Sequence, residues 1–160
     1  MTSNNSTPEQ AITAACLRLL ARREHSQKEL QTKLSAKGWS KDEVPPVLAA
    51  LAEQGWQSDD RYAESYARSR LLKGYGPVLI AYELRQKGAA DIDLDALVQT
   101  VAGSWQALLA QVYHKKYGSD ALPDRQEWAK RSRFLLQRGF SGTMVSSFYQ
   151  QLNTKIQGAL

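Results

Sequence analysis

The chain has 160 residues, of which 42% are hydrophobic and 9% aromatic, so it can bury a core and is not expected to be disordered as a whole. No apolar run approaches the ~18 residues of a membrane span, and the polar start over 1–10 lacks a secretory pattern. The single cysteine, Cys16, excludes a disulfide framework and is interpreted as a small core residue. We therefore expect a cytoplasmic protein without a membrane partner, whose net charge of +5 keeps polyanions among the candidate partners.

Apolar residues at helical spacing and capping signals predict three short helices in the first third of the chain. Ser26 with Glu29, and Ser40 with Glu43, form capping boxes at the start of the second and third helices. Three such helices joined by tight turns resemble a helix-turn-helix bundle. The predicted helices cover about 9–24, 26–38 and 40–54.

The rest of the chain repeats this plan twice. Ser58, Asp59 and Asp60 start a helix, and we expect the two carboxylates to lie near the unpaired amides of its own first turn. No segment shows the sustained alternation of a strand, so the predicted fold class is all-α. The predicted helices cover about 59–73, 77–88, 94–102, 105–117, 126–138 and 141–155.

One short motif recurs along the chain: a leucine, two variable residues, a cation and a glycine. Its glycines are Gly38, Gly88 and Gly139, which lie 50 and 51 residues apart. Each copy is typical of a helix end, because the cation suits the carboxyl-terminal dipole and glycine takes the left-handed conformation that closes the helix. A period of this length indicates stacked helical repeats, which more often hold a macromolecule than enclose a catalytic pocket.

We therefore predict three tandem three-helix, helix-turn-helix-like repeats in an elongated or curved array within a monomer. The predicted ranges are a flexible N-terminal tail over 1–8, repeats over 9–56, 57–104 and 105–155, and a C-terminal tail over 156–160.

The charge changes sign along the chain in step with this architecture. It is positive over 1–40, 61–87 and 105–154 and negative between them, which favours a polyanion or a partner of alternating charge over a surface of merely mixed charge. For any single cation, a solvated helix face stays the favoured alternative. Cations can neutralise phosphates, and an exposed tyrosine can stack on a base. The candidate partner- or DNA-binding residues are Arg61, Arg68, Arg70, Lys73, Tyr75, Arg85, Lys87, Lys115, Lys116, Arg131, Arg133 and Arg138.

Arg70 stands out because it lies near the middle of the apolar face of the predicted 59–73 helix. An unpaired arginine would be costly in that position. Two interpretations stay open: a partly buried ion pair with a carboxylate such as Asp59 or Glu83, or a face that reaches a partner.

Catalytic and metal chemistry find little support in the sequence. His25 and His114 are too few and too scattered for a zinc site, and the aspartates over 91–95 lack the glycine and distal glutamate of a calcium loop. The glycines over 74–77 are not followed by the Gly-Lys-Ser/Thr of a nucleotide-binding loop. We therefore expect no cofactor, no metal and no catalytic residue.

The middle of the chain carries a long specific string of residues: Gly55-Trp56-Gln57-Ser58-Asp59-Asp60-Arg61-Tyr62-Ala63, Arg70, Lys73-Gly74-Tyr75-Gly76-Pro77, Ile80, Glu83-Leu84 and Lys87-Gly88. This string closely resembles the signature of the RecX regulatory proteins. The segment from Arg133 to Ser141 resembles the carboxyl-terminal signature of that family, and the resemblance extends over about 10–152. Two positions depart from the usual pattern: Leu79 replaces a common basic residue and Ala89 a common isoleucine.

The resemblance implies a small cytoplasmic bacterial protein of three three-helix repeats, without catalytic activity, that binds the RecA recombinase. It implies binding mainly to the RecA filament on single-stranded DNA, with weak direct DNA binding allowed. It also implies inhibition of ATP hydrolysis, strand exchange and the SOS coprotease activity, and so control of recombination and repair. The residues alone leave two alternatives, a stand-alone helix-turn-helix DNA-binding regulator and a protein-only scaffold.

Overall fold

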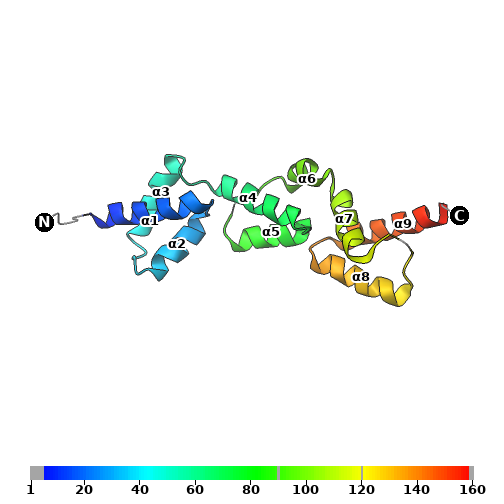
Figure 1. Ribbon diagram of the computed structural model, residues 1–160. Helices are drawn as coiled ribbons and strands as arrows, with labels where there is room; N and C mark the ends of the chain where they lie inside the picture. Colours follow the sequence, from blue (N-terminus) through cyan, green and yellow to red (C-terminus); the bar gives the residue numbers. More distant parts are fainter. Residues whose placement is uncertain (1–5, 90, 120, 159–160) are drawn as a thin grey trace. The chain divides into compact units, whose positions relative to one another are not determined.

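The computed structural model describes residues 6–89, 91–119 and 121–158, which form nine α-helices and no strands, as the all-α prediction requires (Figure 1). The chain divides into two compact units, unit 1 over 1–65 and 84–92 and unit 2 over 66–83 and 93–160. The helices are α1 (Pro8–Arg22), α2 (Gln27–Ala36), α3 (Val44–Glu53), α4 (Asp59–Leu72), α5 (Pro77–Gln86), α6 (Leu94–Ala102), α7 (Trp105–Tyr117), α8 (Arg125–Gln137) and α9 (Gly142–Gly158).

The predicted capping box at α2 is confirmed. The Ser26 hydroxyl accepts a hydrogen bond from the Glu29 amide at 3.1 Å, and the Glu29 carboxylate accepts one from the Ser26 amide at 3.3 Å. The Ser40–Glu43 bonds also form, at 3.2 and 3.3 Å, but residues 41–43 make a turn and α3 begins only at Val44. Two consecutive prolines follow at the start of α3, where their missing amide donors cost little.

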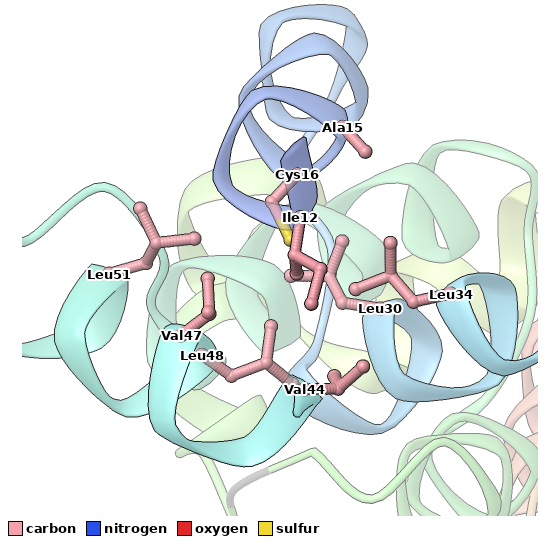
Figure 2. Packing of buried hydrophobic residues seen from close by; sticks show 9 residues of the cluster. All are labelled: Ile12, Ala15, Cys16, Leu30, Leu34, Val44, Val47, Leu48 and Leu51. Atoms are coloured by element: carbon pink, nitrogen blue, oxygen red, sulfur yellow. The ribbon is translucent and has the colours of Figure 1, made fainter. Parts of the chain in front are cut away.

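Unit 1 has a hydrophobic core to which α1, α2 and α3 each contribute (Figure 2). Cys16 is fully buried in this core, and burial raises the pKa of its thiol although Lys37 acts in the opposite direction. The interpretation of Cys16 as a small core residue is therefore confirmed. The buried members are Ile12, Ala15, Cys16, Leu30, Leu34, Val44, Val47, Leu48 and Leu51.

Asp59 and Asp60 lie in the first turn of α4, as predicted, but the hydrogen bonds of Asp59 go elsewhere. The carboxylate of Asp59 accepts hydrogen bonds from the amide of Gln27 at 2.9 Å and from the buried side chain of Gln57 at 2.9 Å. Gln27 is the first residue of α2, whose first amides have no partner within the helix. The Ser58 hydroxyl caps α4 instead, accepting from the Arg61 amide at 3.1 Å. Asp59 thus joins α4 to α2 within unit 1.

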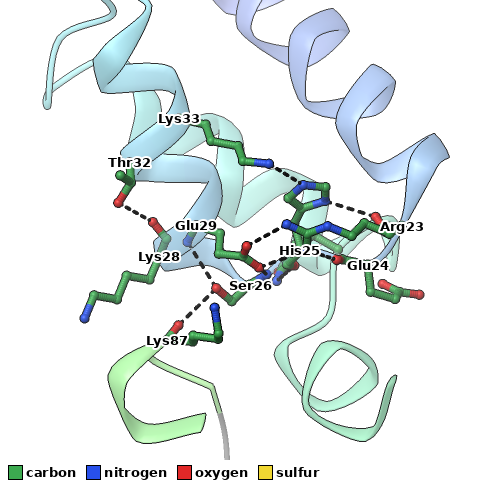
Figure 3. A network of polar contacts seen from close by, with 10 residues as sticks. Arg23, Glu24, His25, Ser26, Lys28, Glu29, Thr32, Lys33 and Lys87 are labelled. Atoms are coloured by element: carbon green, nitrogen blue, oxygen red, sulfur yellow. Dashed lines mark hydrogen bonds and ion pairs between the residues drawn. The ribbon is translucent and has the colours of Figure 1, made fainter. Parts of the chain in front are cut away.

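The second copy of the glycine motif ends against the start of α2, also within unit 1. The Ser26 hydroxyl donates to the Lys87 carbonyl at 3.0 Å (Figure 3), and the Lys28 ammonium donates to the Gln86 carbonyl at 2.9 Å. These two donors satisfy carbonyl groups that the end of α5 leaves without helical partners. Helix C-terminal carbonyls also favour a nearby positive charge such as Lys28.

The third copy ends in the same way within unit 2, against the start of α5. The Gly76 amide donates to the Arg138 carbonyl at 2.8 Å, and the Val78 amide donates to the Gly139 carbonyl at 2.9 Å. Residues 76–78 follow residues 26–28 by 50 positions, the period of the motif itself. The motif therefore marks a junction at its second and third copies, where the end of one helix meets the start of another.

His25 lies in a polar cluster beside the junction of α5 with α2 in unit 1 (Figure 3). Its side chain is buried, with an exposed fraction of only 2%. Its Nδ1 is 3.0 Å from the Arg23 carbonyl, and its Nε2 is 3.0 Å from the Lys33 ammonium. Because the carbonyl only accepts and the ammonium only donates, these contacts require a neutral ring with its proton on Nδ1. Burial lowers the pKa of His25, and the charges of Arg23 and Lys33 lower it further, against the opposite effects of the hydrogen bond to the Arg23 carbonyl and of the Glu29 charge.

The stability of unit 1 is expected to fall in mild acid through His25. The pKa of His25 is lower in the folded than in the unfolded chain, so the unfolded chain takes up the proton first as pH falls below about 6.5. One proton can change the free energy of unfolding by at most about 1.4 kcal/mol per pH unit. Urea unfolding between pH 7.5 and 5.5 should therefore show a smaller loss of stability for His25→Asn, which stays neutral, than for the wild type.

Glu29 does not titrate in that range. Although burial opposes its ionisation, hydrogen bonds from Arg23 and the Ser26 amide lower its pKa to about 2.

The matched control for His25→Asn is His114→Asn, which replaces a half-buried histidine of unit 2. Equal pH dependence of the wild type and His25→Asn would contradict the assignment.

Candidate functional site

Arg70, at the end of α4, pairs with a carboxylate on α5. Its guanidinium donates to one oxygen of Glu83, from Nη2 at 2.9 Å and from Nε at 3.3 Å, and the Tyr66 hydroxyl donates to the other oxygen. Both charged side chains are about one-fifth exposed. Of the two interpretations of Arg70, the ion pair with Glu83 is confirmed, and Asp59 binds α2 instead.

Tyr75 lies in the turn between α4 and α5, where two guanidinium groups stack on its ring. The Cζ atom of Arg70 is 3.8 Å from the ring centroid, and that of Arg138, at the end of α8, is 4.5 Å away. Gly74 places the tyrosine here, because its φ of +85° ends α4 and lets the Tyr75 amide donate to the Arg70 carbonyl at 3.1 Å. Such contacts stabilise a partly buried guanidinium and set its orientation.

In the third predicted repeat, Arg131 on α8 is held by its own neighbours. It donates to the Tyr113 hydroxyl at 2.8 Å and to the Glu127 carboxylate at 3.1 Å, and its Cζ lies 4.5 Å from the Tyr117 ring centroid. Burial opposes its charge, but the two hydrogen bonds outweigh burial and raise the pKa of Arg131. Burial also raises the pKa of Tyr117, opposed by Arg131. This arginine ties α7 to α8.

The structure separates the predicted site residues into three groups. Arg61, Arg70 and Arg131 form ion pairs with carboxylates of the chain; for Arg61 the partner is Glu24 at 3.0 Å. Arg138, Lys116 and Tyr75 take part in cation–π contacts. The remaining six are Arg68, Lys73, Arg85, Lys115 and Arg133, which are exposed, and Lys87, which is half-buried.

Unit 2 contains a groove with a volume of about 510 Å³ between the end of α4, the end of α6, α7 and α8. It brings together four of the predicted cations, Lys73, Lys115, Lys116 and Arg138. Its other lining residues are Leu71, Leu72, Gly74, Val101, Ala102, Leu108, Gln111, Val112 and Phe134. An arrangement of cations around an apolar floor can bind an anionic ligand that also carries an apolar group.

Sequence reasoning missed the apolar part of this groove, and Leu72 is its clearest member. Leu72 is 72% exposed, although its neighbour Leu71 is fully buried. The signal was present in the sequence, since two adjacent leucines on a helix point about 100° apart and only one can face the same core. Phe134, which lies within the Arg133–Ser141 segment, belongs to the same apolar lining.

Within the described residues, no group of three or more His, Cys, Asp or Glu side chains is placed to hold a metal ion. The same part of the chain has no helix that is long and apolar enough to cross a membrane. The chemistry that the groove supports is the binding of anions by its grouped cations.

Three family models match the chain in order, and together they cover most of it. The first, second and third three-helix domains of RecX match residues 14–51, 58–96 and 105–148. The chain belongs to the RecX family. Each match lies within one of the three predicted repeat ranges, and RecX proteins form a regulatory, non-enzymatic family.

Relatives described as regulatory protein RecX resemble the chain over most of its length. The protein of Halorhodospira halophila is 43% identical over 136 residues, which are 85% of this chain and 84% of the relative. The protein of Chromohalobacter salexigens is 40% identical over 88% of this chain and 91% of its own, and that of Pseudomonas fluorescens strain SBW25 is 39% identical over 85% and 88%.

Two solved RecX structures share the fold. The crystal structure of RecX from Lactobacillus salivarius superposes with a TM-score of 0.74 at 25% identity, over 91% of this chain and 97% of that one. A second crystal structure of regulatory protein RecX has a TM-score of 0.74 at 24% identity, over 89% of this chain and 73% of its own.

Proposed function

We propose that this protein binds the RecA filament on single-stranded DNA and inhibits its ATP hydrolysis, its strand exchange and its SOS coprotease activity. The observation that carries the proposal is membership in the RecX family, with three domain models in order and 43% identity to a RecX over 85% of the chain. The protein would thereby act as a cytoplasmic negative regulator of recombination and repair. We propose that it does so as a monomer.

The proposed mechanism is that several helical repeats contact more than one RecA subunit. Such bridging would hinder the motions between subunits that accompany ATP turnover, or block the path of incoming duplex DNA. Exposed cations of the second and third repeats are the proposed contacts, above all Lys73, Arg85, Lys115 and Arg133. Their support is that, among the described residues, these four have no carboxylate within ion-pair distance.

The proposal is tested by measuring RecA ATP hydrolysis on single-stranded DNA while this protein is titrated well below one copy per RecA. A parallel measurement follows its binding to the same DNA without RecA. We expect strong inhibition and weak, salt-dependent binding to bare DNA. Tight binding to bare DNA without inhibition would instead support a stand-alone DNA-binding regulator.

A charge-matched pair of variants tests the proposed contact residues. Arg85→Gln/Arg133→Gln removes two exposed cations of the second and third repeats, and Arg18→Gln/Arg22→Gln removes two exposed cations of α1. Two exposed ion pairs, one from each arginine to the partner, are worth about 0.4–2 kcal/mol together. Half-inhibition should therefore need about 2- to 30-fold more of the Arg85→Gln/Arg133→Gln variant than of the wild type. Equal shifts for both variants would mean that total charge matters and the location does not.

A further inference from the structure

The groove in unit 2 combines an apolar floor with an excess of positive charge. Leu72, at the end of α4, is 72% exposed there, beside the half-buried Val101 and Ala102 of α6. An exposed leucine beside other apolar side chains in a concave surface is typical of a binding site. The volume of about 510 Å³ lies within the range of sites that enclose a small ligand or a few side chains.

Four cations surround this floor, and none of the described residues that line it is acidic. Lys73, Lys115, Lys116 and Arg138 belong to the lining, and within the described part of the chain none has a carboxylate at ion-pair distance. Grouped charges of one sign repel one another and attract an anion, and concave apolar walls strengthen that attraction. The ligand that complements the groove is therefore negatively charged.

Arg138 adds a second indication. Its Nε atom is buried and finds no hydrogen-bond acceptor among the residues described. Cation–π contacts hold the guanidinium, at 4.5 Å from the Tyr75 centroid and 5.6 Å from that of Phe134. Arg138 also lines the groove, and because arginine readily binds carboxylates, its guanidinium suits an incoming carboxylate.

The aromatic rings near the groove are already occupied by cations. The Lys116 ammonium lies 3.7 Å from the Phe134 centroid, and Arg70 and Arg138 stack on Tyr75. Single-stranded nucleic acid binds largely by stacking its bases on free aromatic faces. The floor is instead mostly aliphatic, which suits a leucine, isoleucine or phenylalanine side chain better than a base.

We propose that this groove binds an acidic peptide segment that places one large apolar side chain on the Leu72 floor and carboxylates against the surrounding cations. This proposal deepens the proposed function. It rests on that function only in one respect, namely that the partner protein would supply the peptide segment. Peptide recognition by apolar anchors within a charged rim is a common mode of protein association.

The test is fluorescence anisotropy with a labelled twelve-residue peptide of alternating Glu and Gly that carries one central Leu. The controls are the same peptide with Ser in place of Leu, the same peptide with Gln in place of Glu, and a labelled twelve-nucleotide oligo-dT. We expect the Leu peptide to bind about tenfold more tightly than the Ser peptide, because the apolar contact is lost in the latter. We expect the Gln peptide and the oligo-dT to bind more weakly than the Leu peptide.

Two variants locate the binding, and both change exposed side chains, so folding should be retained. Leu72→Gln should weaken binding of the Leu peptide about tenfold and leave binding of the Ser peptide unchanged. Lys115→Gln should weaken binding of both peptides up to about fivefold, and the effect should be smaller at high salt. The matched controls are Leu136→Gln and Lys130→Gln, exposed positions outside the groove, which should bind like the wild type.

Three results would overturn the assignment: no binding of the Leu peptide, equal binding of the Leu and Ser peptides, or tighter binding of oligo-dT that Leu72→Gln abolishes. The last would identify a nucleic-acid site. This test contains no RecA, so it can fail while the wild type still inhibits ATP hydrolysis. Conversely, the peptide can bind as expected while the inhibition assay fails, which would reject the proposed function and leave the groove assigned.

Discussion

Gly139→Ala should destabilise unit 2 by about 2–5 kcal/mol, the sum of a backbone cost and a packing cost. Gly139 ends the third copy of the glycine motif with a φ of +100°, a conformation that side chains rarely adopt. An added Cβ would also lie 2.4 Å from the Cβ of Leu79 and 2.9 Å from its amide nitrogen. Relief would have to move the start of α5, whose amides hold the Arg138 and Gly139 carbonyls.

The first copy of the motif supplies the matched control. Gly38 has a φ of +99°, and an added Cβ there would meet nothing within 4 Å. Gly38→Ala should therefore cost only the backbone term of about 1–2 kcal/mol. Urea unfolding measures the two free energies, and hydrogen exchange assigns each loss to unit 1 or unit 2. Equal losses for the two variants would mean that the close approach to Leu79 contributes nothing.

Leu135→Ala should destabilise unit 2 by about 2–5 kcal/mol, because it removes a fully buried side chain and leaves a cavity. Leu135 is the leucine of the same third motif, and its carbonyl accepts a hydrogen bond from the Phe140 amide at 3.2 Å that closes the helix. Its counterparts Leu34 and Leu84 are buried as well. The leucine is thus the position through which the motif contributes to a core.

The neighbouring residue allows a comparison within one helix. Leu136 is 45% exposed, so Leu136→Ala carries the same change in helix propensity with a much smaller loss of burial. We expect a cost below about 1 kcal/mol for Leu136→Ala, measured by the same urea unfolding. Similar free energies of unfolding for the two variants would contradict the packing role of Leu135.

The groove gathers four of the cations that the sequence singled out. Its cations were recognisable as a class from the sequence, but Arg61, Arg70 and Arg131 belonged to the same class and are held by carboxylates of the chain. The difference matters for experiments, because replacing a paired arginine changes stability as well as binding. Variants of Lys115 or Leu72 test recognition more cleanly, since both side chains are exposed.

The sequence by itself determined the features that depend on residues a few positions apart. The helices lie close to the predicted ranges, and α6 and α7 match them, because apolar periodicity and capping act within one or two turns. The same locality explains the capping box at Ser26 and the helix ends at Gly38, Gly88 and Gly139, all of which have positive φ. The family signature added the regulatory class.

Only the tertiary structure decided which distant groups meet. Asp59 binds the start of α2 instead of its own helix, the amides of Gly76 and Val78 hold the end of α8, and Leu72 lies exposed in a groove. The two sets of hydrogen bonds depend on which of several chemically equal partners packing brings within about 3 Å, and local sequence carries no such distance. The exposure of Leu72 depends on which helix face the fold covers. Hydrogen bonds and ion pairs act at short range, so Arg61, Arg70 and Arg131, which have a carboxylate in reach, became structural.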